Sequence, residues 1–362
     1  MTKLLLITSE FPPQPGGIGA HAHNLAKFLT KNNFEVTVLT DMRSALGQEE
    51  RNFDFKQAYK VKRIPRKKFM LLTYLKRIYS AVALCNKNDV ILVSGKFSLW
   101  IGGLLSLISS KKIIGVVHGS EVAMPASFRK VCTKWCVRQL TVVIAVSKYT
   151  KSLIADWDLA HIEVIPNGFS LASAPVNGNK SLKPIRLITV GNVTERKGQQ
   201  NVIKALPEIL QKFPDAIYNI VGIPTEIENL LHLTKKLNVE HAVIFHGKVS
   251  EEEKIKLLQE STVFIMLSQT TATGDVEGFG IAILEANSVG VPAIGSKNCG
   301  IEDAISHNNS GILVDYYNSK AIVIALQTII KEYDAYSNCA VTWSKQFVWD
   351  SVIKDYIKVV QL

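Results

Sequence analysis

Two glutamates, Glu277 and Glu285, stand eight residues apart in a stretch of otherwise apolar or small residues, GDVEGFGIAILEANSVGVP (274–292). Glycines precede and follow a run of about ten residues that has the composition of a buried helix. Glu277 is therefore expected in the loop before this helix, and Glu285 one turn inside it. An ionised carboxylate that is buried without a partner costs several kcal/mol. Each glutamate therefore needs a partner, and a bound ligand is one candidate.

The hydroxyls and phosphates of a nucleotide would suit this stretch. A carboxylate can accept hydrogen bonds from two ribose hydroxyls, so Glu285 would hold a ribose. Backbone N–H groups at a helix start attract phosphate, and here they belong to Phe279, Gly280 and Ile281. The alternative is that Glu285 pairs with a neighbouring lysine or a backbone amide and binds no ligand.

Two adjacent cations, Arg196 and Lys197, follow the strand-like run IRLITVG (185–191). They fall in a strand-to-helix loop at the carboxyl end of the predicted strand, which is where open α/β sheets bind ligands. A pair of cations there suits a diphosphate, whose charge needs neutralising when it is bound and more so when it leaves. A solvated loop is the alternative for any isolated Arg-Lys pair.

A glycine-rich loop follows the first strand, in SEFPPQPGGIGAHAHNLAKFL. Residues 17–22 match the G-x-G-x-x-A pattern of dinucleotide-binding folds, with Asp41 after the next strand. That fold needs its first glycine in a tight turn directly after the strand, whereas here three prolines intervene. Gly16 and Gly17 are better explained as a longer loop whose N–H groups approach a phosphate at the start of helix 20–31. A nicotinamide or flavin site and a purely structural turn are the alternatives.

The elements that must position these residues alternate between short apolar runs and helix-like segments, which is typical of an α/β fold with parallel strands. The strand-like runs form two sets, at 3–8, 35–40, 89–94, 113–118 and 141–147, and at 185–191, 216–222, 242–247, 262–268 and 291–296. Helices are expected between them, among others at 20–31, 99–110 and 199–212.

The two sets of strands predict two Rossmann-like, doubly wound domains that face each other across a cleft, because such sheets bind ligands at the carboxyl ends of their strands. We place the first domain at 1–170 and the second at 185–341. Residues 171–184 are rich in Ser, Asn, Pro and Gly and predict a linker. Residues 342–362 have helical spacing and are expected to pack back across the domains.

Composition restricts the class of protein. A length of 362 residues suits about two domains, and 47% hydrophobic with 20% charged residues is ordinary for a globular chain. No apolar run reaches the ~18 residues of a membrane-spanning helix, and the N-terminus MTKLLLITSEFPP resembles a first strand rather than a signal peptide. The five cysteines contain no C-x-x-C pair, which favours reduced thiols in the cytoplasm. Cys132 and Cys136 are one helical turn apart, where helix packing and a shared metal ion are the two interpretations.

Charge is unevenly distributed along the chain. Residues 1–180 carry 25 basic and 11 acidic residues, whereas residues 181–362 carry 17 and 20. The basic excess concentrates in KQAYKVKRIPRKKFMLLTYLKR (56–77), where cations alternate with apolar and aromatic residues. This segment is either a solvated loop and helix face or a surface for an anionic membrane. Nucleic acid is not expected as a partner, because no nucleic-acid-binding motif accompanies the segment.

The quoted motifs resemble those of retaining family 4 glycosyltransferases with the GT-B fold. Glu277 and Glu285 fit the E-x7-E pattern of that family. The resemblance extends along the chain through FPPQPGGIG, VVHGSE, VIAVSKYT, VIPNG, VGNVTERKGQ, FHGKV and DVEGFGIAILEANSVGVPAIG, which stand in the family's order. The combination is most similar to the phosphatidylinositol mannosyltransferase branch, whose donor is GDP-mannose. Other branches use UDP-sugars with similar residues.

The resemblance implies a role for each matching residue. The catalytic set would be His118, facing the donor sugar, Arg196 and Lys197, holding the diphosphate as it departs, and Glu277, on sugar hydroxyls. The donor-binding set would be Gly16, Gly17, Gly191, Val249, Phe279, Gly280, Ile281 and Glu285. The first domain would take the acceptor and the second the nucleotide-sugar. Without the resemblance, His118 would be interpreted as a core histidine.

Two departures from the family pattern weaken individual contacts. Asn192-Val193 stands where many members have Gly-Arg-Leu, which affects the expected base contact near Gly191. Phe169 stands where Val or Ile followed by Asp is common, so one acidic contact is missing.

The expected activity is transfer of a hexose, with mannose favoured, from a nucleotide-sugar to a hydroxyl of a lipid-linked or glycan acceptor, with retention, in cell-envelope polysaccharide or glycolipid synthesis. No metal and no other cofactor is expected, because Arg196 and Lys197 would supply the positive charge. Asp275-Val276-Glu277 superficially matches an Asp-x-Asp metal motif, but precedes a helix in the second sheet. A cytoplasmic protein, peripheral on the inner face of the plasma membrane, is expected. The alternatives are a UDP-sugar-dependent transferase, an epimerase or phosphorylase of the same fold, and a non-catalytic sugar-nucleotide sensor.

Overall fold

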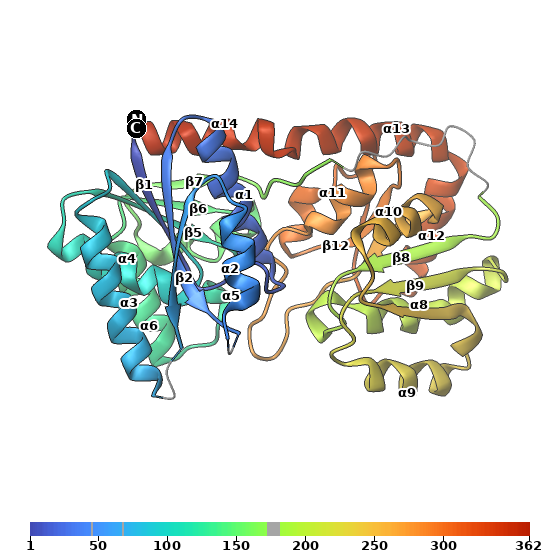
Figure 1. Cartoon of the computed structure of the whole chain (residues 1–362). Coiled ribbons are helices and arrows are strands. Elements are labelled where there is room, and N and C mark those ends of the chain that lie inside the picture. The colour runs from blue at the N-terminus through green and yellow to red at the C-terminus, as the bar shows by residue number, and fades with distance from the viewer. Residues whose placement is uncertain (45, 67–68, 172–181) are drawn as a thin grey trace. The chain divides into compact units, whose positions relative to one another are not determined.

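The computed structural model describes residues 1–44, 46–66, 69–171 and 182–362, so most of the predicted linker at 171–184 lies outside the described residues. The chain divides into two compact units (Figure 1). The first comprises Met1–Gly168 together with Trp349–Leu362, and the second comprises Phe169–Val348. Among the described residues, no helix is both long enough and apolar enough to cross a membrane.

The first unit is built on a parallel sheet of seven strands in the order β3-β2-β1-β4-β5-β6-β7. The strands are β1 (Lys3–Thr8), β2 (Glu35–Met42), β3 (Lys60–Pro65), β4 (Val90–Ser94), β5 (Lys112–Val117), β6 (Val142–Ala145) and β7 (Ile162–Val164). Strands β1, β4 and β5 are buried on both faces and are accordingly near-continuous runs of aliphatic residues.

Two helical layers cover this sheet. Because β-α-β crossovers are right-handed and the strand order reverses between β1 and β4, helices that precede and follow the reversal lie on opposite faces. One layer contains α3 (Met70–Cys85), α4 (Lys96–Ile108) and α6 (Phe128–Arg138), which pack side by side (Figure 1). The opposite layer contains α1 (Gly17–Lys31), α2 (Gln48–Phe55) and α14 (Trp349–Gln361). Two short helices, α5 (Ser120–Ala123) and α7 (Lys148–Ser152), follow β5 and β6 respectively.

The second unit is a parallel sheet of six strands in the order β10-β9-β8-β11-β12-β13. The strands are β8 (Arg186–Val190), β9 (Ile217–Val221), β10 (Val243–Gly247), β11 (Val263–Met266), β12 (Ala293–Ser296) and β13 (Gly311–Val314). The helices are α8 (Gln199–Lys212), α9 (Ile227–Leu237), α10 (Glu251–Glu260), α11 (Ile281–Ser288), α12 (Ser319–Lys331) and α13 (Tyr333–Ser344). The strand order reverses between β8 and β11, which is the place where doubly wound sheets bind ligands.

Every strand-like run predicted from the sequence is a strand, so the α/β prediction is confirmed. Three further strands, β3, β7 and β13, were not predicted. The most consequential is β3, since it lies inside the basic segment 56–77 that was interpreted as a loop and helix face or a membrane surface. Two of its cations form ion pairs within the unit, Lys60 with Glu35 at 2.8 Å and Arg63 with Asp54 at 2.8 Å.

The predicted C-terminal helix is two helices. α13 ends at Ser344, a 3-10 turn covers Lys345–Phe347, and α14 begins at Trp349. The Phe169 N–H donates to the Phe347 carbonyl at 3.0 Å, so the two ends of the second unit are adjacent. α14 packs on α1 within the first unit, where the buried Trp349 ring stacks on Phe28 with centroids 5.8 Å apart.

Candidate active site

The second unit gathers its predicted site residues at the carboxyl edge of its sheet. Arg196 and Lys197 lie in a 3-10 turn after β8, and Glu277 lies in the loop after β11, the strand beside β8. Val249 follows β10, and Glu285 is on α11. Because all the strands are parallel, these loops emerge at one edge.

Glu277 joins the two predicted cations. Its Oε2 contacts Lys197 Nζ at 2.7 Å and also pairs with Arg196 Nη1. Arg196 Nε donates in turn to Asp275 Oδ2 at 3.1 Å. The cation side chains are only 23% and 14% exposed for Arg196 and Lys197, so the interpretation as a solvated loop is wrong.

The electrostatics of this cluster are dominated by ion pairing. Burial raises the pKa of Glu277, but the charges of Lys197 and Arg196 outweigh it and lower that pKa to about 2. The charge of Glu277 raises the pKa of Arg196 above its ordinary value. The cluster therefore combines two basic side chains, Arg196 and Lys197, with two carboxylates, Glu277 and Asp275. A diphosphate that enters must share these cations with the two carboxylates.

The loop after β8, which carries Arg196 and Lys197, is held against the residues that follow β11. Gly198 follows Lys197 with φ +77°, and a Cβ there would lie 1.9 Å from the Leu267 carbonyl oxygen, so only glycine fits. Asn201 Nδ2 donates to the same Leu267 oxygen at 2.9 Å, and the Gln269 N–H donates to the Arg196 carbonyl at 3.2 Å. The cations therefore stand on a fixed backbone.

Glu285 differs from its prediction. It was expected in a buried helix with a ribose as its partner, but its side chain is 28% exposed and its Oε1 lies 3.1 Å from Lys254 Nζ. The alternative of a neighbouring lysine is thus what the structure shows. Lys254 is on α10, and it also contacts Glu251 at 2.7 Å. A contact from Glu285 to a ribose stays a prediction, in which the ligand would share the carboxylate with Lys254.

The remaining donor-site residues provide backbone rather than side chains. Gly191 follows β8, and a Cβ there would press on the Lys197 stem at 3.1 Å. Gly280 adopts the left-handed conformation, φ +92°, immediately before Ile281 starts α11. Phe279 is buried with its ring 5.7 Å from that of Phe347, so only its main chain is available to a ligand.

In the first unit, His118 follows β5 and is held on two sides. Its Nε2 lies 2.9 Å from Ser94 Oγ, at the end of the neighbouring strand β4, and its backbone N–H donates to Glu121 Oε1 at 2.8 Å. The His21 ring from α1 meets the His118 ring edge-on, with centroids 5.0 Å apart. His118 keeps part of its surface accessible. The core histidine is instead His21, which is 2% exposed and bonded to Tyr356 Oη at 3.0 Å.

Both histidines are neutral at physiological pH. Enclosure by protein atoms lowers the pKa of His118 to about 4. Burial, and then the nearby His118, lower the pKa of His21 well below its ordinary value. His118 therefore offers a hydrogen bond rather than a positive charge to any group beside it. Sequence reasoning missed Ser94 and Glu121 as its partners, although Glu121 stands in the quoted motif VVHGSE.

Glu121 is a buried carboxyl with one oxygen that is unsatisfied within the described part of the chain. It is 4% exposed, and its Oε2 has no hydrogen-bond partner among the described residues. Burial raises its pKa to about 6, although the His118 N–H acts in the opposite direction. A folded-state pKa above the unfolded value of 4.5 means that ionisation destabilises the fold as pH rises through 4.5 to 6.

Glu121→Gln is therefore expected to raise the free energy of unfolding at pH 8 by about 2 kcal/mol, and to have little effect near pH 4.5, where Glu121 is already neutral. Denaturant unfolding at the two pH values measures this difference. The exposed Glu49→Gln on α2 is the control. A destabilisation by Glu121→Gln that is the same at both pH values would contradict the assignment.

The loop after β1 carries Gly16 and Gly17 at the N-terminus of α1. A Cβ on Gly16 would lie 2.5 Å from Glu10 Oε2, whereas a Cβ on Gly17 would meet nothing within 4 Å. The space beside Gly17 is thus open, and a carboxylate stands near the helix start. A phosphate at this place stays a prediction.

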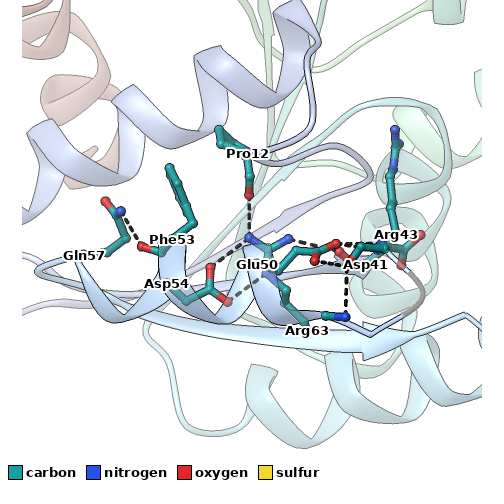
Figure 2. A network of polar contacts seen from close by, with 10 residues as sticks. Pro12, Asp41, Arg43, Glu50, Phe53, Asp54, Gln57 and Arg63 are labelled. Atoms are coloured by element: carbon teal, nitrogen blue, oxygen red, sulfur yellow. Dashed lines mark hydrogen bonds and ion pairs between the residues drawn. The ribbon is translucent and has the colours of Figure 1, made fainter.

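Arginines fix this loop to the sheet edge (Figure 2). Arg63 on β3 donates to both carboxylate oxygens of Asp54, each at 2.8 Å, and to the Pro12 carbonyl at 2.5 Å. Asp41, the acidic residue of the dinucleotide interpretation, is buried and pairs with the buried Arg77. The nicotinamide or flavin alternative therefore lacks the acidic residue it requires.

The models of two families match consecutive parts of the chain. The model described as Glycosyltransferase Family 4 matches residues 15–173, and the one described as Glycosyl transferases group 1 matches residues 174–342. The chain belongs to the family 4 glycosyltransferases. The family assignment and the transferase class predicted from the sequence are thereby confirmed.

This glycosyltransferase is 28% identical over 350 residues to a GDP-mannose-dependent α-(1-6)-phosphatidylinositol monomannoside mannosyltransferase of Mycolicibacterium smegmatis. The alignment covers 91% of this chain and 89% of the relative. Among solved structures, sucrose-phosphate synthase of Thermosynechococcus elongatus superposes with a TM-score of 0.84 at 18% identity, covering 100% of this chain and 98% of that one. Anabaena HepE in complex with UDP and glucose gives 0.79 at 18% identity, covering 100% of both chains. These structures share the predicted GT-B fold.

Proposed function

We propose that this glycosyltransferase moves a hexose, mannose in preference to other sugars, from a nucleotide-sugar to a hydroxyl of a lipid-linked or glycan acceptor, with retention. The observation that carries the proposal is the pair Arg196–Lys197, fixed at the switch point between β8 and β11 and joined there by Glu277. Cell-envelope synthesis at the inner face of the plasma membrane is part of the same proposal, since a lipid-linked acceptor would lie there.

The chemistry of the leaving group explains why cations stand there. As the bond from the sugar carbon to the diphosphate breaks, negative charge grows on the phosphate oxygen. Arg196 and Lys197 are already oriented, so they stabilise this charge without reorganisation. Glu277 holds them in place before the donor enters, and its other oxygen is then available to sugar hydroxyls. Donor contacts at Gly16, Gly17, Gly191, Val249, Gly280, Ile281 and Glu285 belong to the same proposal.

The acceptor hydroxyl must lose a proton during transfer. His118 is a weak base at neutral pH, because its pKa is lowered to about 4. The departing phosphate oxygen is the stronger candidate for the proton acceptor, which corresponds to a front-face route with retention. His118 would then orient the donor sugar through a hydrogen bond.

The donor base is tested by calorimetry with GDP and UDP. The names of relatives such as the mycobacterial mannosyltransferase support GDP-mannose, and we expect tighter binding of GDP. Turnover of GDP-mannose with an added acceptor hydroxyl then tests the sugar. A clear preference for UDP would reject the GDP-mannose assignment and leave the transferase class intact.

Donor turnover is expected to need no divalent ion, because Arg196 and Lys197 would neutralise the departing diphosphate. Activity measured after exhaustive chelation should equal that of the untreated enzyme. Chelator that has been saturated with calcium beforehand serves as the control for effects of the chelator itself. Complete loss of activity that magnesium or manganese restores would overturn this part of the proposal.

A further inference from the structure

The outer face of the α3–α4–α6 layer is unusually apolar. Large side chains stand exposed along each helix, with exposed fractions from 41% for Leu104 to 82% for Phe128. Representative residues, two from each helix, are Leu71, Tyr79, Leu107, Ile108, Phe128 and Val131. They follow helical spacing, as with Phe128, Val131 and Trp135 on α6, so each helix presents a stripe. Because α3 contacts α4 and α4 contacts α6, the stripes lie on one face.

The opposite helical layer of the same unit behaves differently. Among the described residues of α1, α2 and α14, Phe55 is the only large apolar side chain that is strongly exposed. Exposed apolar residues scattered singly are normal, whereas a face that gathers them is characteristic of an interaction site. The apolar exposure is thus a property of one face and not of the unit as a whole.

The charges on this layer have one sign. Helices α3, α4 and α6 contain seven lysines and arginines and no aspartate or glutamate. Lys76 on α3 and Arg129 on α6 are exposed among the apolar stripes. Arg77 does not contribute, since it is buried against Asp41. Lys134 and Arg138 pair with the exposed Asp156 and Asp158, which makes this end of the layer the less basic one.

An apolar groove opens on the same face. It lies between α3 and α4, has a volume of about 230 Å³, and is lined by aliphatic side chains that include Ile78, Val82 and Leu104. No polar side chain is among its lining residues. A groove of this chemistry accommodates hydrocarbon and offers nothing to a polar ligand.

We propose that the outer face of α3, α4 and α6 docks on an anionic lipid bilayer. Exposed aliphatic and aromatic residues would enter the interface between head groups and acyl chains, and the interspersed cations would meet anionic head groups. A second copy of the chain fits less well, because two such faces would bring lysines and arginines against each other. The docking face is thus the helical layer, rather than the whole segment 56–77, whose strand β3 is part of the sheet.

Binding of the protein to vesicles is measured without donor, so it tests the docking face separately from the proposed reaction. The experiment is co-sedimentation of the full chain with vesicles of phosphatidylcholine alone and of phosphatidylcholine with phosphatidylglycerol. We expect binding to the anionic vesicles, weakened by salt, because each Lys or Arg near such a surface adds about 1 kcal/mol that ions screen.

Two sets of substitutions separate the apolar and ionic parts. The triple variant Leu71→Ser, Ile108→Ser and Phe128→Ser is expected to reduce the bound fraction about tenfold or more, through lost apolar insertion. The pair Lys76→Glu and Arg129→Glu is expected to abolish the preference for anionic vesicles. Phe55→Ser on α2, which removes an apolar side chain that is 93% exposed, is the matched control and should bind as the unchanged protein does.

Melting temperatures identify any variant that fails to fold, and the charge-reversal pair then tests the proposal independently. Equal binding of the unchanged protein to neutral and anionic vesicles, or binding to neither, overturns it. Self-association in the absence of lipid that the triple variant abolishes would assign the face to a second copy, and would also overturn it. Loss of vesicle binding with unaltered turnover in solution leaves the proposed reaction untouched.

Discussion

Replacing Lys197 or Arg196 by alanine is expected to lower kcat by roughly two to three powers of ten, the typical cost of removing one preorganised charge stabiliser. The KM for the donor should change much less. The reason is that charge on the phosphate oxygen grows as the sugar bond breaks, so a fixed cation gains more in the transition state than in the bound donor. Steady-state kinetics with the donor varied give both parameters.

The control for this experiment is Lys204→Ala, which removes an exposed lysine from α8, a few residues further along the chain. It should leave both parameters unchanged. Glu285→Gln should behave in the opposite way to the cation variants, by raising KM through a lost ribose contact with a smaller effect on kcat. If Lys197→Ala and Arg196→Ala raise KM alone, the pair only holds the donor, and leaving-group stabilisation must come from other residues.

Glu277→Gln is expected to lower kcat about a hundredfold or more while tightening the binding of a nucleoside diphosphate. Two effects are combined in this substitution. The proposed contact to sugar hydroxyls loses its charge-assisted strength, and Arg196 and Lys197 lose the carboxylate that competes with phosphate for them. Calorimetry with the diphosphate and kinetics with the donor separate the two effects. Weaker diphosphate binding would show that Glu277 orients the cations more than it competes for them.

The same substitution has a signature in the pH dependence of stability. The folded-state pKa of Glu277 is about 2, below its ordinary value of 4.5, because Lys197 and Arg196 outweigh the effect of burial. Its ionic contribution, of roughly 3 kcal/mol, is complete above pH 4.5 and is lost as pH falls towards 2. The unfolding free energy of the Glu277→Gln variant should therefore depend less on pH over that window. An unchanged acid profile would contradict the pairing.

The fold could be predicted from the sequence where local pattern and tertiary role agree. Runs such as KLLLIT and DVILVS each contain four consecutive aliphatic residues that are buried, so their hydrophobicity alone identifies them. Strand β3, with the sequence KVKRIP, buries only Ile64 and lies at the sheet edge, where cations are tolerated and even useful. Its strand character follows from pairing with β2 and is invisible in its composition.

The elements that carry the candidate site residues could be predicted from the sequence, whereas the ion pairs between those residues and their neighbours could not. The glycines on either side of 281–288 place Glu277 before a helix and Glu285 within it, which is where the structure has them. Nothing in the spacing connects Glu285 with Lys254, which is 31 residues away on another helix. A neighbouring lysine was one of the two partners considered for Glu285, but which lysine it is depends on the helix that packs beside α11 and could not be predicted from the sequence.

The return of the chain to its first unit has a consequence for synthesis on the ribosome. α14 covers the buried face of α1. The Trp349 ring stacks on Phe28, and Tyr356 Oη is hydrogen-bonded to His21 Nε2. α14 is translated after every strand of the second unit. The first unit therefore keeps an apolar surface uncovered until α14 has been made, and the second unit, although it is encoded later, is the first that can finish folding. A chain that lost only α14 would carry its defect in the unit that contains Met1–Gly168.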